Sequence, residues 1–204
     1  SRLAAPIVNA TIALHAEVSD AFLPTAVKFH YQWNLRAMAN AFNGLVAMNP
    51  VSYKSPVVMA RLWIHETRRV YGDRMVNQTD VDRLEEILAK NVKAHLGEMP
   101  AEELNEEPNL FASFVTDDDA KFYLPFTKGW SQLSEILETK LAEYNESYAQ
   151  MNLVLFNAAM EHIVRISRII GSPRGNAMLV GVGGSGKQSL TRLGAFIGQA
   201  TFFQ

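Results

Sequence analysis

A glycine-rich segment near the end of the chain constrains the fold more than any other feature. Residues 181–189 read GVGGSGKQS and match the pattern G-x-x-x-x-G-K of a phosphate-binding loop. Such a loop follows a buried strand and opens a helix. The apolar run at 176–180 predicts the strand, and the spacing of leucines predicts a helix over 185–197. The sequence therefore predicts a nucleotide-binding protein of the P-loop class.

The residue types in this segment suit an anionic ligand. Glycines let the backbone turn so that successive N–H groups point into one concavity, and the following helix adds its positive end. Lys187 can reach the outer phosphates as a point charge. The candidate nucleotide-binding residues of the loop are Gly181, Val182, Gly183, Gly184, Ser185, Gly186, Lys187, Gln188 and Ser189.

The position after the lysine departs from the pattern. A serine or threonine there normally supplies the hydroxyl that binds Mg²⁺, but this chain has Gln188, with a hydroxyl one residue later at Ser189. An amide oxygen can also bind a hard cation, with a different reach. Gln188 and Ser189 are therefore the candidate Mg²⁺ ligands. No Asp or Glu follows Glu161, so this region contains no carboxylate to hold the metal or activate water.

Composition excludes several other classes. The chain has 204 residues, enough for one large domain or two small ones, and 48% of them are hydrophobic. A net charge of −2 gives no global field that favours nucleic acid or an anionic membrane. There is no cysteine and no apolar run long enough for a membrane span. We expect neither nucleic acid nor membrane as a partner, and we interpret the chain as a piece of a longer protein.

Helical periodicity dominates the rest of the chain. Ser55 and Pro56 predict the cap and first turn of one helix, and Thr79 with Asp82 predict the start of another. An acidic segment, 97–119, reads as a solvated loop. Helices are expected at 7–18, 31–46, 55–71, 79–92, 132–148 and 153–170, and short strands at 121–126 and 201–203. The expected fold is mainly α, with an α/β start at the phosphate-binding loop.

Longer stretches resemble one family of motor proteins. LVLFNAAMEHIVRISRII at 153–170 and NAMLVGVGGSGKQSLTRL at 176–193 resemble the start of the fourth AAA+ module of dynein heavy chains. Gln-Ser after the loop lysine is the axonemal form. FLPTAVKFHYQWNLRAMANAFNGL at 22–45 and LWIHETRRVYGDRM at 62–75 resemble the end of the third module. The motifs agree with axonemal dynein heavy chains in identity, order and distance.

The resemblance implies a division into parts and a role for several residues. Residues 1–96 would form the helical small, or lid, domain of the third AAA+ module. Residues 97–148 would connect it to the N-terminal part of the fourth module at 149–204. Arg36 matches the sensor-two arginine, which faces the third module's nucleotide, and Ala37 stands where relatives often carry an acidic residue. By the same resemblance, Leu153 and Val154 would belong to the segment that packs near the adenine of the fourth module.

The resemblance also implies a function for the whole protein. It would be an ATPase that drives movement along microtubules in the axoneme of cilia and flagella. The fourth site would bind ATP or ADP, with Mg²⁺, in a mainly regulatory way, and this segment alone would not hydrolyse ATP. Its partners would be the remainder of the heavy-chain ring and, through other parts of the protein, microtubules and intermediate and light chains.

Two alternatives come from other classes. A stand-alone nucleotide kinase would also need a P-loop, but its loop normally lies near the N-terminus, whereas here it lies in the last part of the chain. A helical scaffold with a decayed nucleotide loop would retain the motif without binding. Nucleotide titration with a Lys187→Ala control separates the scaffold from the motor.

Overall fold

The computed structural model describes residues 3–48, 53, 55–116 and 122–203, which form two compact units. Unit 1 covers Ser1–Asn109 and unit 2 covers Leu110–Gln204. Helices dominate both, as the sequence predicts. The domain limits 1–96, 97–148 and 149–204 remain predictions, since compactness alone does not identify the modules to which the units belong.

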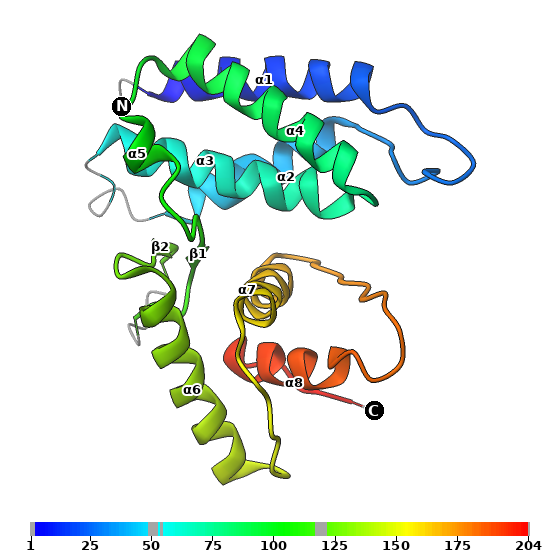
Figure 1. Cartoon of the computed structure of the whole chain (residues 1–204), viewed down its shortest axis with the longest axis vertical. Helices are drawn as coiled ribbons and strands as arrows, with labels where there is room; N and C mark the ends of the chain where they lie inside the picture. The colour runs from blue at the N-terminus through cyan, green and yellow to red at the C-terminus, as the bar shows by residue number, and fades with distance from the viewer. Residues whose placement is uncertain (1–2, 49–52, 54, 117–121, 204) are drawn as a thin grey trace. The chain divides into compact units, whose positions relative to one another are not determined.

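Unit 1 is an all-helical bundle. Figure 1 shows α1 beside α4 and α2 beside α3. Its helices are α1 (Ala4–Ala21), α2 (Leu35–Val46), α3 (Pro56–Val70), α4 (Gln78–Asn91) and α5 (Ala101–Leu104), with a 3₁₀ turn at Gly72–Arg74 and a π-helical turn at Val92–Leu96. Trp63 is completely buried and donates its indole N–H to the Thr11 hydroxyl at 2.9 Å, which ties α3 to α1. Burial of such apolar side chains stabilises the bundle.

The helix starts in unit 1 test the capping predictions. The Ser55 hydroxyl accepts a hydrogen bond from the Val57 N–H, so the predicted cap of α3 is confirmed. The predicted Thr79 cap is wrong, because the Asn77 side chain accepts from the Asp80 N–H and α4 begins at Gln78. Asn is at least as good a cap as Thr and lies two residues earlier. Asp82 accepts from the Gln78 side chain and forms no capping box.

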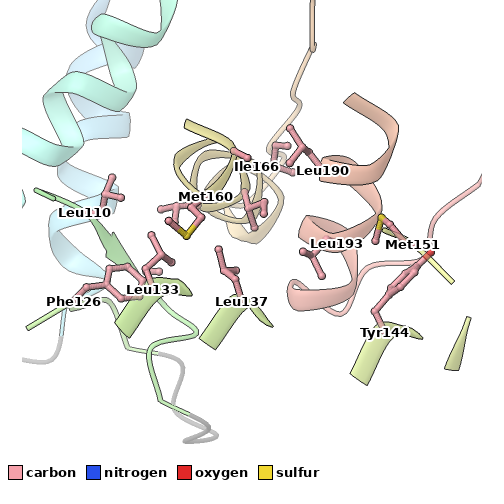
Figure 2. Close-up of a cluster of buried hydrophobic side chains, with 14 residues drawn as sticks. Leu110, Phe126, Leu133, Leu137, Tyr144, Met151, Met160, Ile166, Leu190 and Leu193 are labelled. Atoms are coloured by element: carbon pink, nitrogen blue, oxygen red, sulfur yellow. The ribbon is translucent and has the colours of Figure 1, made fainter. Parts of the chain in front are cut away.

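Unit 2 places three helices around one apolar core. They are α6 (Gly129–Ser147), α7 (Asn157–Gly171) and α8 (Lys187–Ile197). The unit also contains a short antiparallel pair of strands, β1 (Phe111–Ala112) and β2 (Leu124–Pro125). Figure 2 shows Leu133 and Leu137 of α6 turned toward Met160 of α7 and Leu193 of α8. The core therefore fixes α8, the helix that opens at the phosphate-binding motif.

Several predicted boundaries are wrong. Residues 176–180 and 201–203 form no strand, because the only sheet among the described residues is β1 with β2, so neither segment has a neighbour to pair with. The acidic segment 97–119 is not entirely loop, since it contains α5 and β1. α2 begins at Leu35 rather than at 31, and α7 at Asn157 rather than at 153.

Gly194 sets the closest approach of α8 to α7. A Cβ at this position would lie 2.7 Å from Ile166 Cγ2 and 3.2 Å from Ile166 Cβ, so there is no room for a methyl group. Ile166 is itself buried and β-branched, with a stiff side chain. The contact therefore requires glycine in the middle of α8.

We predict that Gly194→Ala destabilises unit 2. Alanine is the better helix former by about 1 kcal/mol, but overpacking of a core costs about 1–3 kcal/mol and here forces two helices apart. Chemical denaturation of the 204-residue chain measures the net change. Gly171→Ala on α7 is the control, since a Cβ there meets nothing within 4 Å. Equal stability of the two variants would contradict the packing argument.

Candidate functional site

The glycine-rich segment turns sharply before α8. Gly184 has φ +75° and Gly186, the N-cap residue of α8, has φ +76°, a left-handed conformation that favours glycine. α8 has no side-chain cap, so the N–H groups of its first turn have neither a helical nor a capping partner. The positive end of the helix dipole lies at the same place. These features suit the binding of an anion such as a phosphate group.

Lys187, the first residue of α8, turns its side chain back across the loop. Its Nζ donates to the carbonyl oxygens of Gly181 at 2.8 Å and Val182 at 2.6 Å, and to the Ser185 hydroxyl at 3.0 Å. Gly181 packs close to this ammonium group, since a Cβ there would lie 3.6 Å from Nζ. The structure therefore brings the lysine and the loop backbone together around one point.

The two candidate metal ligands occupy the first turn of α8. Gln188 is exposed and Ser189 is half-buried. Neither side chain makes a hydrogen bond to another described residue, so both oxygens are available to a cation. Within the described parts of the chain, no group of three or more His, Asp or Glu side chains is arranged to hold a metal ion. A cation at this turn would need oxygen ligands from elsewhere, such as phosphate or water.

The predicted adenine-side segment lies before α7. Leu153 is half-buried and packs against the core of unit 2, whereas Val154 is 78% exposed. Asn145 fixes the start of the segment: its amide oxygen accepts from the Met151 N–H at 2.8 Å, and its amide nitrogen donates to the Met151 carbonyl at 3.2 Å. Val154 therefore presents an apolar surface on a segment tied to the end of α6.

Arg36 lies in unit 1, whereas the other candidate residues belong to unit 2. It is the second residue of α2 and is exposed. Its backbone N–H donates to the Asn34 side chain at 3.0 Å, but its guanidinium has no hydrogen-bond or ion-pair partner among the described residues. The structure thus places Arg36 in one compact unit and the phosphate-binding loop in the other.

A polar brace holds the loop that leads to Arg36. Asp80 Oδ2, in the first turn of α4, accepts from Lys28 Nζ and from the Tyr31 hydroxyl, both at 2.6 Å. The Tyr31 hydroxyl in turn accepts from the Val76 N–H at 3.1 Å. Burial and the hydrogen bond to Asp80 raise the pKa of Tyr31 to about 12. No local sequence pattern predicts this brace, because Asp80 lies 52 residues after Lys28 and 49 after Tyr31.

Comparisons with family models find one match within each unit. Residues 7–105 match the model of the AAA+ lid domain, and residues 151–204 match that of the P-loop containing dynein motor region D4. Among the described residues, no helix has both the length and the hydropathy that crossing a bilayer requires.

Curated relatives match over nearly the whole chain. A ciliary dynein beta chain from Tripneustes gratilla is 46% identical over 203 residues, covering 100% of this chain. Human dynein axonemal heavy chain 17 is also 46% identical over 203 residues and 100% of the chain. The flagellar outer-arm dynein beta chain of Chlamydomonas reinhardtii is 48% identical over 97% of it. The chain spans only 4% of the length of each of these relatives.

The brace predicts a pH-dependent contribution to stability. Burial raises the pKa of Asp80, but hydrogen bonds from Lys28 and Tyr31 outweigh it and hold the pKa below its ordinary value of 3.8. We expect Asp80→Asn to lower the free energy of unfolding by about 1 kcal/mol at neutral pH. Because the folded-state pKa is depressed, the difference from wild type persists above pH 3.8 and disappears as the pH falls through the folded-state value.

Urea denaturation between pH 3 and 7 measures this difference. Asp82→Asn is the control, since among the described residues Asp82 is hydrogen-bonded only to Gln78 of the same helix. A difference between wild type and Asp80→Asn that stays constant down to the lowest pH would contradict the assignment to the Asp80 carboxylate.

Proposed function

Since the chain belongs to the axonemal dynein heavy-chain family, we propose that it is a segment of an ATP-driven microtubule motor of cilia and flagella. The observation that carries this proposal is the match of both units, in one order, to relatives about 46% identical over the whole chain. In this proposal, unit 1 is the lid of the third AAA+ module and unit 2 begins the fourth. The protein would act in the axoneme, with the rest of the heavy-chain ring as its immediate partner.

The loop at 181–189 would bind the phosphates of ATP or ADP. Support comes from the N–H groups at the start of α8, which have no capping side chain, and from the ammonium of Lys187 above the loop. Leu153 and Val154 would contact the adenine. Gln188 and Ser189, whose side chains make no hydrogen bond to another described residue, are the residues that would hold Mg²⁺, whose chemistry is to neutralise phosphate charge.

Catalysis by this segment alone is not expected. Hydrolysis needs a carboxylate to bind the metal or orient water, and the last Asp or Glu of the chain, Glu161, lies on α7 and pairs with Arg165 at 3.1 Å. We therefore propose that the fourth site has a mainly regulatory role, in which occupancy of the loop changes the behaviour of the ring. Microtubules and intermediate and light chains would contact other parts of the protein.

Arg36 would serve a different nucleotide. As sensor-two arginine of the third module, it would approach the phosphates bound to that module and stabilise negative charge. Its exposure and the absence of a partner among the described residues leave its guanidinium available. The brace of Lys28, Tyr31 and Asp80 orders the loop that precedes it.

We predict that Lys187→Ala in the full-length heavy chain weakens nucleotide binding at the fourth site. A hydrogen bond to a charged group contributes about 1.5–3 kcal/mol, which corresponds to a roughly 10- to 100-fold loss of affinity. Hydrogen exchange of backbone amides in peptides covering 176–190, titrated with ADP, reports this site separately from the others. Lys128→Ala, an exposed lysine of unit 2, is the control. Unchanged protection in Lys187→Ala would favour the scaffold alternative.

We predict that Arg36→Ala lowers ATP turnover without unfolding the lid. An exposed side chain without partners contributes within about 0.5 kcal/mol to stability, whereas loss of a charge facing the transferred phosphate slows turnover by about tenfold or more. Steady-state ATPase rates of the full-length chain test the effect on turnover, and its thermal unfolding tests the effect on stability. Arg83→Ala, an exposed arginine of α4, is the control. Equal ATPase rates for the two variants would refute a sensor role.

A further inference from the structure

All three N–H donors of the Lys187 ammonium group already have acceptors within the loop. An ammonium group carries three N–H donors and accepts nothing. Lys187 Nζ has three oxygen acceptors within 3.0 Å: the carbonyls of Gly181 and Val182 and the hydroxyl of Ser185. A phosphate oxygen can therefore bind the ammonium only if one of these three contacts is given up. Phosphate binding and the internal contacts of the loop compete for the same group.

The Ser185 hydroxyl is the contact most easily exchanged. It is the longest of the three, at 3.0 Å against 2.8 and 2.6 Å, and it is the only one made by a side chain. The two carbonyls are held by the backbone of the loop, whereas a serine hydroxyl rotates about one torsion.

The motif itself does not specify this contact. The pattern G-x-x-x-x-G-K allows any residue before the last glycine. The hydroxyl of Ser185 is therefore a feature of this sequence that the motif does not require. Ser185 is exposed. Its hydroxyl makes no other hydrogen bond to a described residue. Removing the hydroxyl should therefore change the lysine contact and leave the fold intact.

We propose that Ser185 is a positioning residue that holds Lys187 in the phosphate-free loop and so lowers the affinity of this site for nucleotide. The inference rests on the proposed function, that the loop binds ATP or ADP. Ser185 stabilises the state that binding must disrupt, and it acts through Lys187. Loss of its hydroxyl removes a contact from the free loop, while the bound state keeps the lysine-to-phosphate contact.

The test is a double-mutant cycle in the full-length heavy chain. Wild type, Ser185→Ala, Lys187→Ala and the double variant are titrated with ADP, and amide protection of peptides covering 176–190 gives the affinity of this site. We expect Ser185→Ala to bind ADP about three- to tenfold more tightly than wild type. We expect the same substitution to have no effect in the Lys187→Ala background, because there is then no ammonium to hold. Ser185→Thr keeps the hydroxyl and should behave as wild type.

A second measurement reports the free loop directly. Labelling of Lys187 by an amine-reactive reagent, in the absence of nucleotide, should be about threefold faster in Ser185→Ala than in wild type, with Lys128 as the internal reference. A merely structural role of Ser185 would not change the ratio of the two labelling rates.

The outcomes separate the inference from the proposed function. ADP-dependent protection in wild type, with equal or weaker affinity in Ser185→Ala, overturns the inference and leaves the proposed function standing. The inference is also overturned if Ser185→Ala has the same effect with and without Lys187. No ADP-dependent protection in wild type overturns both.

Discussion

The packing of α8 on α7 is the contact on which the candidate site depends. Leu193 of α8 is fully buried, Ile166 of α7 lies almost as deep, and Gly194 lets the two helices approach more closely than a Cβ would allow. Because this apolar contact fixes the axis of α8, it also fixes the direction of its first N–H groups and of its dipole. The polar chemistry of the loop is thus set by a buried hydrophobic contact more than a helical turn away.

The conformation of the loop before α8 depends on the charge of Lys187. Carbonyl oxygens of Gly181 and Val182 point at Lys187 Nζ, while the N–H groups at the start of α8 have no capping side chain. The backbone thereby separates its acceptors, which hold the cation, from its donors, which are left for an anion. This arrangement needs left-handed turns at Gly184 and Gly186, where a side chain would be strained.

Sequence reasoning succeeds here where the determinants are local. The helix after the P-loop motif, the helical periodicity and the Ser55 cap each depend on residues within one or two turns, and the structure agrees with them at the level of elements. Sequence-based prediction fails where an element depends on a partner that is distant in the chain. The run at 176–180 has strand character but no neighbour to pair with among the described residues. α2 begins late because Tyr31, bonded to Asp80, belongs to a braced loop instead.

The position of Arg36 is unfavourable for the stability of unit 1 and would be favourable beside a bound anion. A cation in the first turn of α2 faces the positive end of the helix dipole, which costs about 0.3–1 kcal/mol at an exposed site. No described residue offsets this cost through a hydrogen bond or ion pair with the guanidinium, and an exposed arginine buries little apolar surface. Stability of unit 1 therefore gives no reason for an arginine at this position. An anion bound outside the unit would supply one, and the same positive helix end that disfavours Arg36 in isolation would then add to its attraction for phosphate.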